Sequence, residues 1–154
     1  MTNDVMLTIS GFQSGGNSNE YNPDPEPVEV ITPAKYYFKN GKHYLLYDET
    51  DPQDRSVTHS VLKLRENALS VSHSGDANAH LVIESDKRNV TYYATPFGSL
   101  HILLDGKRVE VEESESLITA EAFYGLEINY DHIADCEIRI RVEPRSIAFS
   151  SKEC

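Results

Sequence analysis

The chain has 154 residues, with 14 Lys and Arg against 25 Asp and Glu, a formal net charge of −11 at pH 7 and 39% hydrophobic residues. This length and composition suit one globular domain, and the acidity argues against nucleic-acid binding, because phosphate contacts require Lys and Arg. No apolar run is long enough to span a membrane and no secretory signal precedes the first apolar segment, so we expect a cytoplasmic protein.

The first part of the chain predicts a strand, a loop and a hairpin. Residues 5–11 form an apolar strand, and residues 11–27, rich in Gly, Asn, Ser and Pro, are typical of a long mobile loop. Residues 36–47 hold two apolar runs that are separated by Asn40-Gly41. Because Asn-Gly adopts the positive φ angles of a two-residue turn, this pattern predicts a β-hairpin.

Four further turn signals divide the middle of the chain into short apolar runs. They lie at residues 66–67, 86–89, 95–98 and 105–106. In the third of them, Gly98 can adopt a positive φ, which favours a tight turn. The fourth, Asp105-Gly106, predicts a hairpin in which residues 100–104 pair with residues 109–111.

The last third of the chain predicts two long strands. Residues 118–130 alternate apolar and polar side chains, with Gly125 as a candidate bulge, and residues 136–143 repeat the alternation. Residues 146–154 predict a loose tail. The repeated strands and tight turns, without a helical period, predict an all-β, antiparallel barrel or sandwich in a single domain over residues 1–145.

The acidic residues gather in two segments. Residues 1–34 carry five acidic side chains and residues 109–138 carry nine, with no Lys or Arg in either segment, whereas residues 35–108 are nearly neutral. Solvated faces that keep the protein soluble account for this pattern. The alternative is an acidic surface, centred on residues 110–115, that binds a basic partner protein.

Residues with metal-binding or catalytic chemistry follow no known motif. The sequence holds Cys136, Cys154 and six histidines, in no zinc-finger, CxxC or HExxH spacing. The histidines are His43, His59, His73, His80, His101 and His132. His59 and His101 lie in predicted strands, so either could face a barrel interior as a donor or general base. We predict no metal, no cofactor and no catalytic residue, and an enzyme that uses an interior histidine is the least favoured alternative.

The aromatic residues indicate what a barrel interior could hold. The chain has nine Tyr, five Phe and no Trp. A Tyr side chain inside a barrel offers apolar area and one hydroxyl group, which suits a small amphipathic ligand, although the same rings could fill the core instead. The candidate lining of such a pocket is Tyr47, His59, Tyr92, His101 and Tyr124.

Four segments occur in an order that is shared with a known family. They are residues 5–11, residues 28–49, Ser74-Gly75 with residues 81–83, and the stretch Tyr-Tyr-Ala-Thr-Pro-Phe-Gly at residues 92–98. In these segments the chain resembles the YwiB-like family of bacterial proteins of unknown function. This family tends to carry Arg at the position of His73, so any site that uses this Arg is altered here.

The resemblance implies a calycin-like, lipocalin-like, up-and-down antiparallel β-barrel. Related barrels such as lipocalins and fatty-acid-binding proteins hold small apolar ligands in the barrel mouth, whereas a fold alone does not define a function. We therefore favour a non-enzymatic protein, monomeric or homodimeric, that binds a small apolar or amphipathic ligand in its barrel. An acidic protein-interaction module is the second hypothesis.

Overall fold

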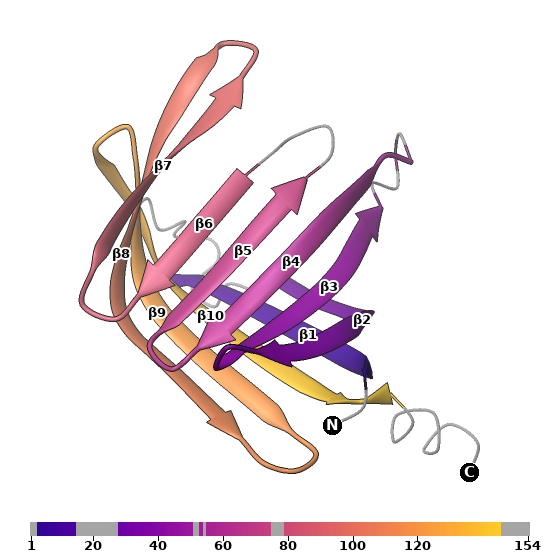
Figure 1. The fold of residues 1–154 in the computed structure, drawn as a ribbon. Helices are drawn as coiled ribbons and strands as arrows, with labels where there is room; N and C mark the ends of the chain where they lie inside the picture. The colour runs from indigo at the N-terminus through magenta and orange to yellow at the C-terminus, as the bar shows by residue number, and fades with distance from the viewer. Residues whose placement is uncertain (1–2, 15–27, 51–52, 54, 75–78, 146–154) are drawn as a thin grey trace.

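The computed structural model describes residues 3–14, 28–50, 53, 55–74 and 79–145. The regular elements within these residues are strands (Figure 1). They are β1 (Asp4–Ser14), β2 (Val28–Lys39), β3 (Lys42–Thr50), β4 (Val57–Arg65), β5 (Ala68–Ser74), β6 (Ala79–Glu84), β7 (Arg88–Thr95), β8 (Gly98–Glu113), β9 (Ile118–Ile128) and β10 (Asp131–Pro144). The described part of the chain contains no helix that is long and apolar enough to cross a membrane.

The strands form one antiparallel sheet that curls into a nearly closed barrel. The strand order in the sheet is β6-β5-β4-β3-β2-β1-β10-β9-β8-β7. Each pair of neighbours consists of consecutive strands of the chain, except for the first strand, β1, which pairs with the last strand, β10. This arrangement confirms the predicted all-β, up-and-down barrel in one domain. The ladder is open between β6 and β7, and Figure 1 shows β7 bending away from β6.

The barrel closes where β8 touches the turn after β6. The Asp86 N–H donates to the Gly106 carbonyl (3.1 Å), and the Gly106 N–H donates to the Lys87 carbonyl (2.8 Å). A Cβ atom at Gly106 would lie 1.8 Å from the Glu84 carbonyl oxygen, so this contact requires glycine. The predicted hairpin at Asp105-Gly106 is wrong, because β8 runs through this dipeptide with only a register shift between Gly106 and Arg108.

The opposite side of the barrel is formed by β2, which changes partner along its length. It pairs with β1 over residues 28–35 and with β3 only over residues 35–39. Pro33, which has no N–H to donate, lies just before the change. The residues of β2 before Lys35 and the residues of β3 after Leu46 are therefore separated. Figure 1 shows β3–β6 crossing the group formed by β1, β10 and β9.

Side chains from both groups of strands fill the barrel centre. The largest fully buried ones are Leu7, Leu45, Leu62, Leu64, Leu69 and Ile118. They belong to one continuous hydrophobic cluster, and complete burial of such a side chain stabilises the fold by about 1.5–3 kcal/mol. In β10, Cys136, Ile140 and Val142 are buried, which confirms the inward face that the alternation predicts.

Three turns show how well local signals predict the chain reversals. Asn40 (φ 54°) and Gly41 (φ 73°) form the predicted two-residue turn between β2 and β3, and Gly98 has the predicted positive φ (120°). The turn between β9 and β10 consists of Asn129 (φ 50°) and Tyr130 (φ 72°). The sequence did not predict this turn, because Tyr is rare at positive φ.

Other boundaries differ from the sequence prediction or lie beyond the described residues. The ladder passes through Gly125 without a bulge, and the irregularity lies between His132 and Ala134 in β10 instead. Strand β1 extends to Ser14, into the segment that was predicted as a loop. Residues 15–27 of that loop and the predicted tail at residues 146–154 lie outside the described residues.

Candidate functional site

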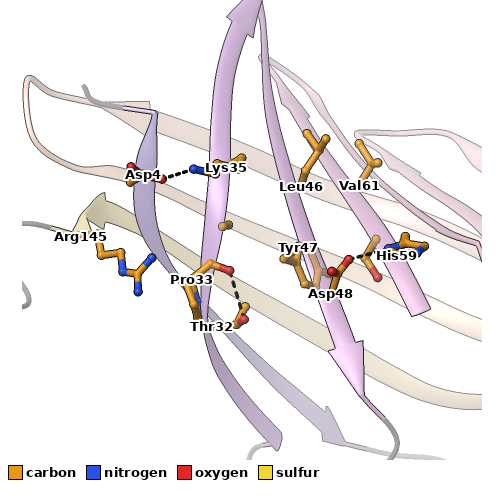
Figure 2. Close-up of a pocket in the computed structure, with 12 residues that line it drawn as sticks. Asp4, Thr32, Pro33, Lys35, Leu46, Tyr47, Asp48, His59, Val61 and Arg145 are labelled. Carbon is orange, nitrogen blue, oxygen red and sulfur yellow. Dashed lines mark hydrogen bonds and ion pairs between the residues drawn. The ribbon is translucent and has the colours of Figure 1, made fainter. Parts of the chain in front are cut away.

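A pocket of about 600 Å³ lies where β2 and β3 separate (Figure 2). Its lining residues are Asp4, Thr32, Pro33, Ala34, Lys35, Leu46, Tyr47, Asp48, His59, Ser60, Val61 and Arg145. They come from β1 to β4 and from the residue after β10. Both inward-facing and outward-facing side chains line the pocket, because it passes through the gap in the barrel wall.

The inner wall of the pocket carries uncharged polar groups. Tyr47 is 6% exposed and Ser60 is 2% exposed, and these two residues are directly opposite each other in the β3–β4 ladder. His73 follows in the same row on β5, and its Nδ1 lies 2.8 Å from the Ser60 Oγ. Burial, with a contribution from the Glu49 charge, raises the pKa of Tyr47 to about 12, so its hydroxyl stays protonated at neutral pH.

The outer part of the pocket combines apolar walls with paired charges. Leu46 and Val61 face each other across β3 and β4 on the outer side. At the rim, the Lys35 Nζ lies 2.5 Å from Asp4, and the His59 Nδ1 lies 2.7 Å from Asp48. Figure 2 shows the Lys35 and His59 pairs on opposite sides of the opening.

Arg145 adds a second positive charge beside Asp4. The hydrogen bond and charge of Lys35, together with the more distant charge of Arg145, lower the pKa of the Asp4 carboxyl group. Figure 2 places Arg145 on the side of Asp4 and Pro33. The charged lining of the pocket is therefore balanced between acidic and basic groups.

The structure brings together two of the five residues that were predicted to line a ligand site. Tyr47 and His59 both line the pocket, from the inner and the outer side of the wall. Tyr124 is half-buried against the core, next to Cys136 in the β9–β10 ladder and away from the pocket. Tyr92 and His101 do not contribute to the pocket.

Tyr92 and His101 lie on the outer surface of the barrel. The inward positions of this part of β8 are Ile102 and Leu104, which pack in the core, so His101 points outward. Its ring stacks on Tyr130 (4.5 Å between centroids) and meets the edge of Tyr92, which is 70% exposed. The expectation that Tyr92 and His101 line the interior fails because the sequence does not show which face of this strand is covered.

The histidines that do face the interior are His43 and His73. His43 is 5% exposed, its Nδ1 accepts a hydrogen bond from the Tyr36 hydroxyl (2.8 Å), and its Nε2 lies 3.3 Å from Glu113. Burial lowers the pKa of His43, and the Glu113 charge opposes this effect. The alternation of His43 with Leu45 and Tyr47 was the signal that could have identified it.

The remaining candidate groups form no metal centre. The described His, Cys, Asp and Glu side chains do not assemble into a group of three or more that could hold a metal ion. Cys136 is a buried free thiol, and burial raises its pKa. Cys154 lies outside the described residues.

The described parts of the two acidic segments are neighbours because β1 pairs with β10. Of the five acidic residues within residues 1–34, Asp4 and Glu29 belong to the described part of the chain. Several of their carboxylates already have basic partners, such as Glu110 with Arg108 (3.5 Å) and Glu137 with Arg139 (2.5 Å). Exposed pairs of this kind contribute little to stability. The described residues of the acidic segments therefore lie in one part of the barrel wall, with part of their charge compensated locally.

This architecture defines a calycin-like, up-and-down β-barrel protein with a pocket at the separation of two strands. The sequence model of the family described as a domain of unknown function, DUF1934, matches residues 13–140. The chain belongs to this family. Comparison with curated proteins gives no match.

A solved structure supports the same fold. The barrel is similar to the crystal structure of the ywiB protein from Bacillus subtilis, with a TM-score of 0.71, 20% sequence identity and coverage of 92% of each chain. This similarity confirms the YwiB-like resemblance. At this identity the similarity concerns the fold alone.

Proposed function

We propose that this protein binds a small amphipathic molecule in the pocket between β2 and β3. The observation that carries the proposal is the pocket itself, whose volume of about 600 Å³ lies in the range of small-molecule sites. It combines apolar walls with a few polar groups at its inner end, which is the composition expected of such sites. We further propose that the protein acts in the cytoplasm, which the buried free thiol of Cys136 supports.

The lining indicates how such a molecule would be held. Its apolar body would lie against Leu46, Val61 and the ring of Tyr47, and a hydrogen-bonding group would reach the Ser60 hydroxyl. The hydrogen bond to His73 holds that hydroxyl in position. An uncharged polar group fits best at this depth, because the neighbouring groups are neutral and a buried charge without a partner is costly.

The charged rim is suited to admit a molecule of this kind. The Lys35–Asp4 and His59–Asp48 pairs are largely exposed on both sides of the opening. Exposed ion pairs are weak, so their side chains can move aside at little cost. They would remain in water while the apolar body enters between them.

Binding can be tested with N-phenyl-1-naphthylamine, an uncharged probe whose fluorescence rises when it leaves water. We expect a saturable increase with the wild-type protein. The Val61→Phe variant should weaken binding at least about tenfold, because the larger ring occupies the pocket. Val90→Phe on β7 is the matched control, because Val90 is an exposed strand valine outside the pocket.

The proposal fails in either of two cases. The first is that the wild-type protein gives no saturable signal. The second is that Val61→Phe and Val90→Phe bind the probe equally well, because the probe would then occupy another part of the surface.

A further inference from the structure

The outer face of β5 forms the floor of a second, smaller pocket. Its outward-facing residues Ala68, Ser70 and Ser72 are small, whereas the flanking strands β4 and β6 carry longer side chains. This difference in height leaves a trough of about 200 Å³. Its lining residues are Lys42, Lys63, Arg65, Ala68, Ser70, His80 and Val82, none of which lines the β2–β3 pocket.

The trough is basic although the protein is strongly acidic. Its lining contains three residues with permanent positive charge and no carboxylate, in a chain of net charge −11. Lys63 places its Nζ 5.4 Å from the centre of the Tyr44 ring. Among the ion pairs of the described residues, neither Lys42 nor Lys63 has a carboxylate partner.

A carboxylate at the end of the trough, Glu84, is engaged by Arg65 and Lys87. It lies opposite Ala68 at the end of the trough and contacts Arg65 (3.1 Å) and Lys87 (3.4 Å). It therefore offsets part of the Arg65 charge and leaves the two lysines uncompensated. Like charges that share a small pocket repel each other, and an anion between them removes this repulsion.

The trough also supplies hydrogen-bonding groups from a histidine and a serine. His80 holds its Nδ1 2.7 Å from the Ser72 Oγ, which leaves its Nε2 for another partner. The Ser70 hydroxyl lies on the floor between the charged side chains. Several donors around positive charge are the arrangement that a phosphate group requires, since its oxygens accept many charge-assisted hydrogen bonds.

We propose that this trough binds the phosphate group of a small molecule. Lys42, Lys63 and Arg65 would supply the charge, and Ser70 and His80 would complete the set of donors. The group is either free inorganic phosphate or a phosphate monoester, whose organic part would lie along Val82. This site is separate from the proposed amphipathic site, so either one can exist without the other.

The test is an amide NMR titration of the ¹⁵N-labelled protein with inorganic phosphate and with phenyl phosphate, at constant ionic strength set with sodium chloride. We expect saturable shifts centred on the Ser70 and Val82 amides with at least one of the two anions. Tighter binding of phenyl phosphate assigns the site to a monoester, and equal binding assigns it to phosphate itself. The absence of saturable shifts beyond those caused by chloride overturns the proposal.

Two variants and one control locate the binding. Lys63→Gln should weaken binding about tenfold through the loss of one charge-assisted contact. Ser70→Leu should abolish it by filling the trough without any change of charge, so that a folding defect in one variant leaves the other informative. Lys107→Gln on β8 makes the same charge change elsewhere and should leave the affinity unchanged. An equal loss in Lys63→Gln and Lys107→Gln overturns the proposal, because it indicates attraction by general charge only.

Discussion

Tyr36 and His43 form a buried hydrogen bond of 2.8 Å between the hydroxyl oxygen and Nδ1. Both side chains are less than 10% exposed, and they lie diagonally across the β2–β3 hairpin on its inward face. On the other side of the ring, Nε2 faces Glu113 of β8 at 3.3 Å. A single tautomer, protonated at Nε2, satisfies both contacts and connects the hairpin to the far side of the barrel.

Replacement of Tyr36 by Phe should reduce the free energy of unfolding by about 1–3 kcal/mol, because it leaves a buried ring nitrogen without a partner. Tyr37→Phe is the matched control, since Tyr37 is the next residue along and is 47% exposed. Its effect should stay within about 0.5 kcal/mol. Urea denaturation followed by circular dichroism measures both values, and equal effects would show that the buried hydrogen bond contributes nothing.

Stability should decrease as the pH falls below 6.5. Burial lowers the pKa of His43 from its ordinary value of 6.5 in the folded state. At pH values between the pKa of His43 in the folded state and its pKa in the unfolded state, the unfolded chain binds more protons than the folded protein. A fall in pH therefore favours unfolding through His43, and its stabilising contribution is complete only above pH 6.5. Urea denaturation between pH 8 and pH 5.5 measures the slope.

The His43→Gln variant should show a shallower decrease over this pH range. His80→Gln is the control, because His80 is exposed and its replacement should leave the slope of the wild-type protein intact. If wild type and His43→Gln lose stability at the same rate with pH, His43 is not the group responsible.

Two Gly-containing dipeptides show how far turn signals predict this fold. Asn40-Gly41 forms the expected two-residue turn, whereas Asp105-Gly106 lies inside the continuous strand β8. The glycine of the second dipeptide serves a contact with the Glu84 carbonyl of a distant strand. Local chemistry explains the first outcome, and only the closed barrel explains the second.

The alternation of side chains predicts faces but not the pocket. Tyr47 points inward and His59 points outward, so a sequence pattern assigns them to opposite sides of the barrel wall. They line one pocket because β2 pairs with β3 only from residue 35 onward, so the wall is open between the preceding residues of β2 and the end of β3. The position of the opening depends on the registers of β2 with both β1 and β3, and residue periodicity does not contain this information.

Gly106→Ala should disrupt the closure of the barrel. The added Cβ atom would lie 1.8 Å from the Glu84 carbonyl oxygen, so backbone must move, at a cost of about 3 kcal/mol or more. Gly125→Ala is the matched control in the next strand, because its nearest neighbour outside the adjacent residues would lie 3.8 Å away. Thermal unfolding compares the two variants.

Hydrogen exchange at the Asp86 amide tests whether this closure is the part that fails. That amide donates to the Gly106 carbonyl, so it should exchange faster in Gly106→Ala than in Gly125→Ala. Unchanged protection of Asp86, together with a wild-type melting temperature, would show that β6 and β8 tolerate the extra carbon.

Asn129 should stabilise the β9–β10 turn through two separable effects. It adopts a φ of 50°, and its Oδ1 accepts a hydrogen bond from the His101 N–H (3.0 Å). Asn129→Gly and Asn129→Ala both remove the acceptor, but Ala keeps a Cβ atom in the left-handed region, whereas Gly adopts this φ without strain. We expect losses of about 1 kcal/mol for Gly and about 2 kcal/mol for Ala, measured by urea denaturation. The difference between the variants isolates the backbone effect, because both lack the same hydrogen bond. If Ala and Gly cost the same, the positive φ contributes nothing to the choice of Asn at this position.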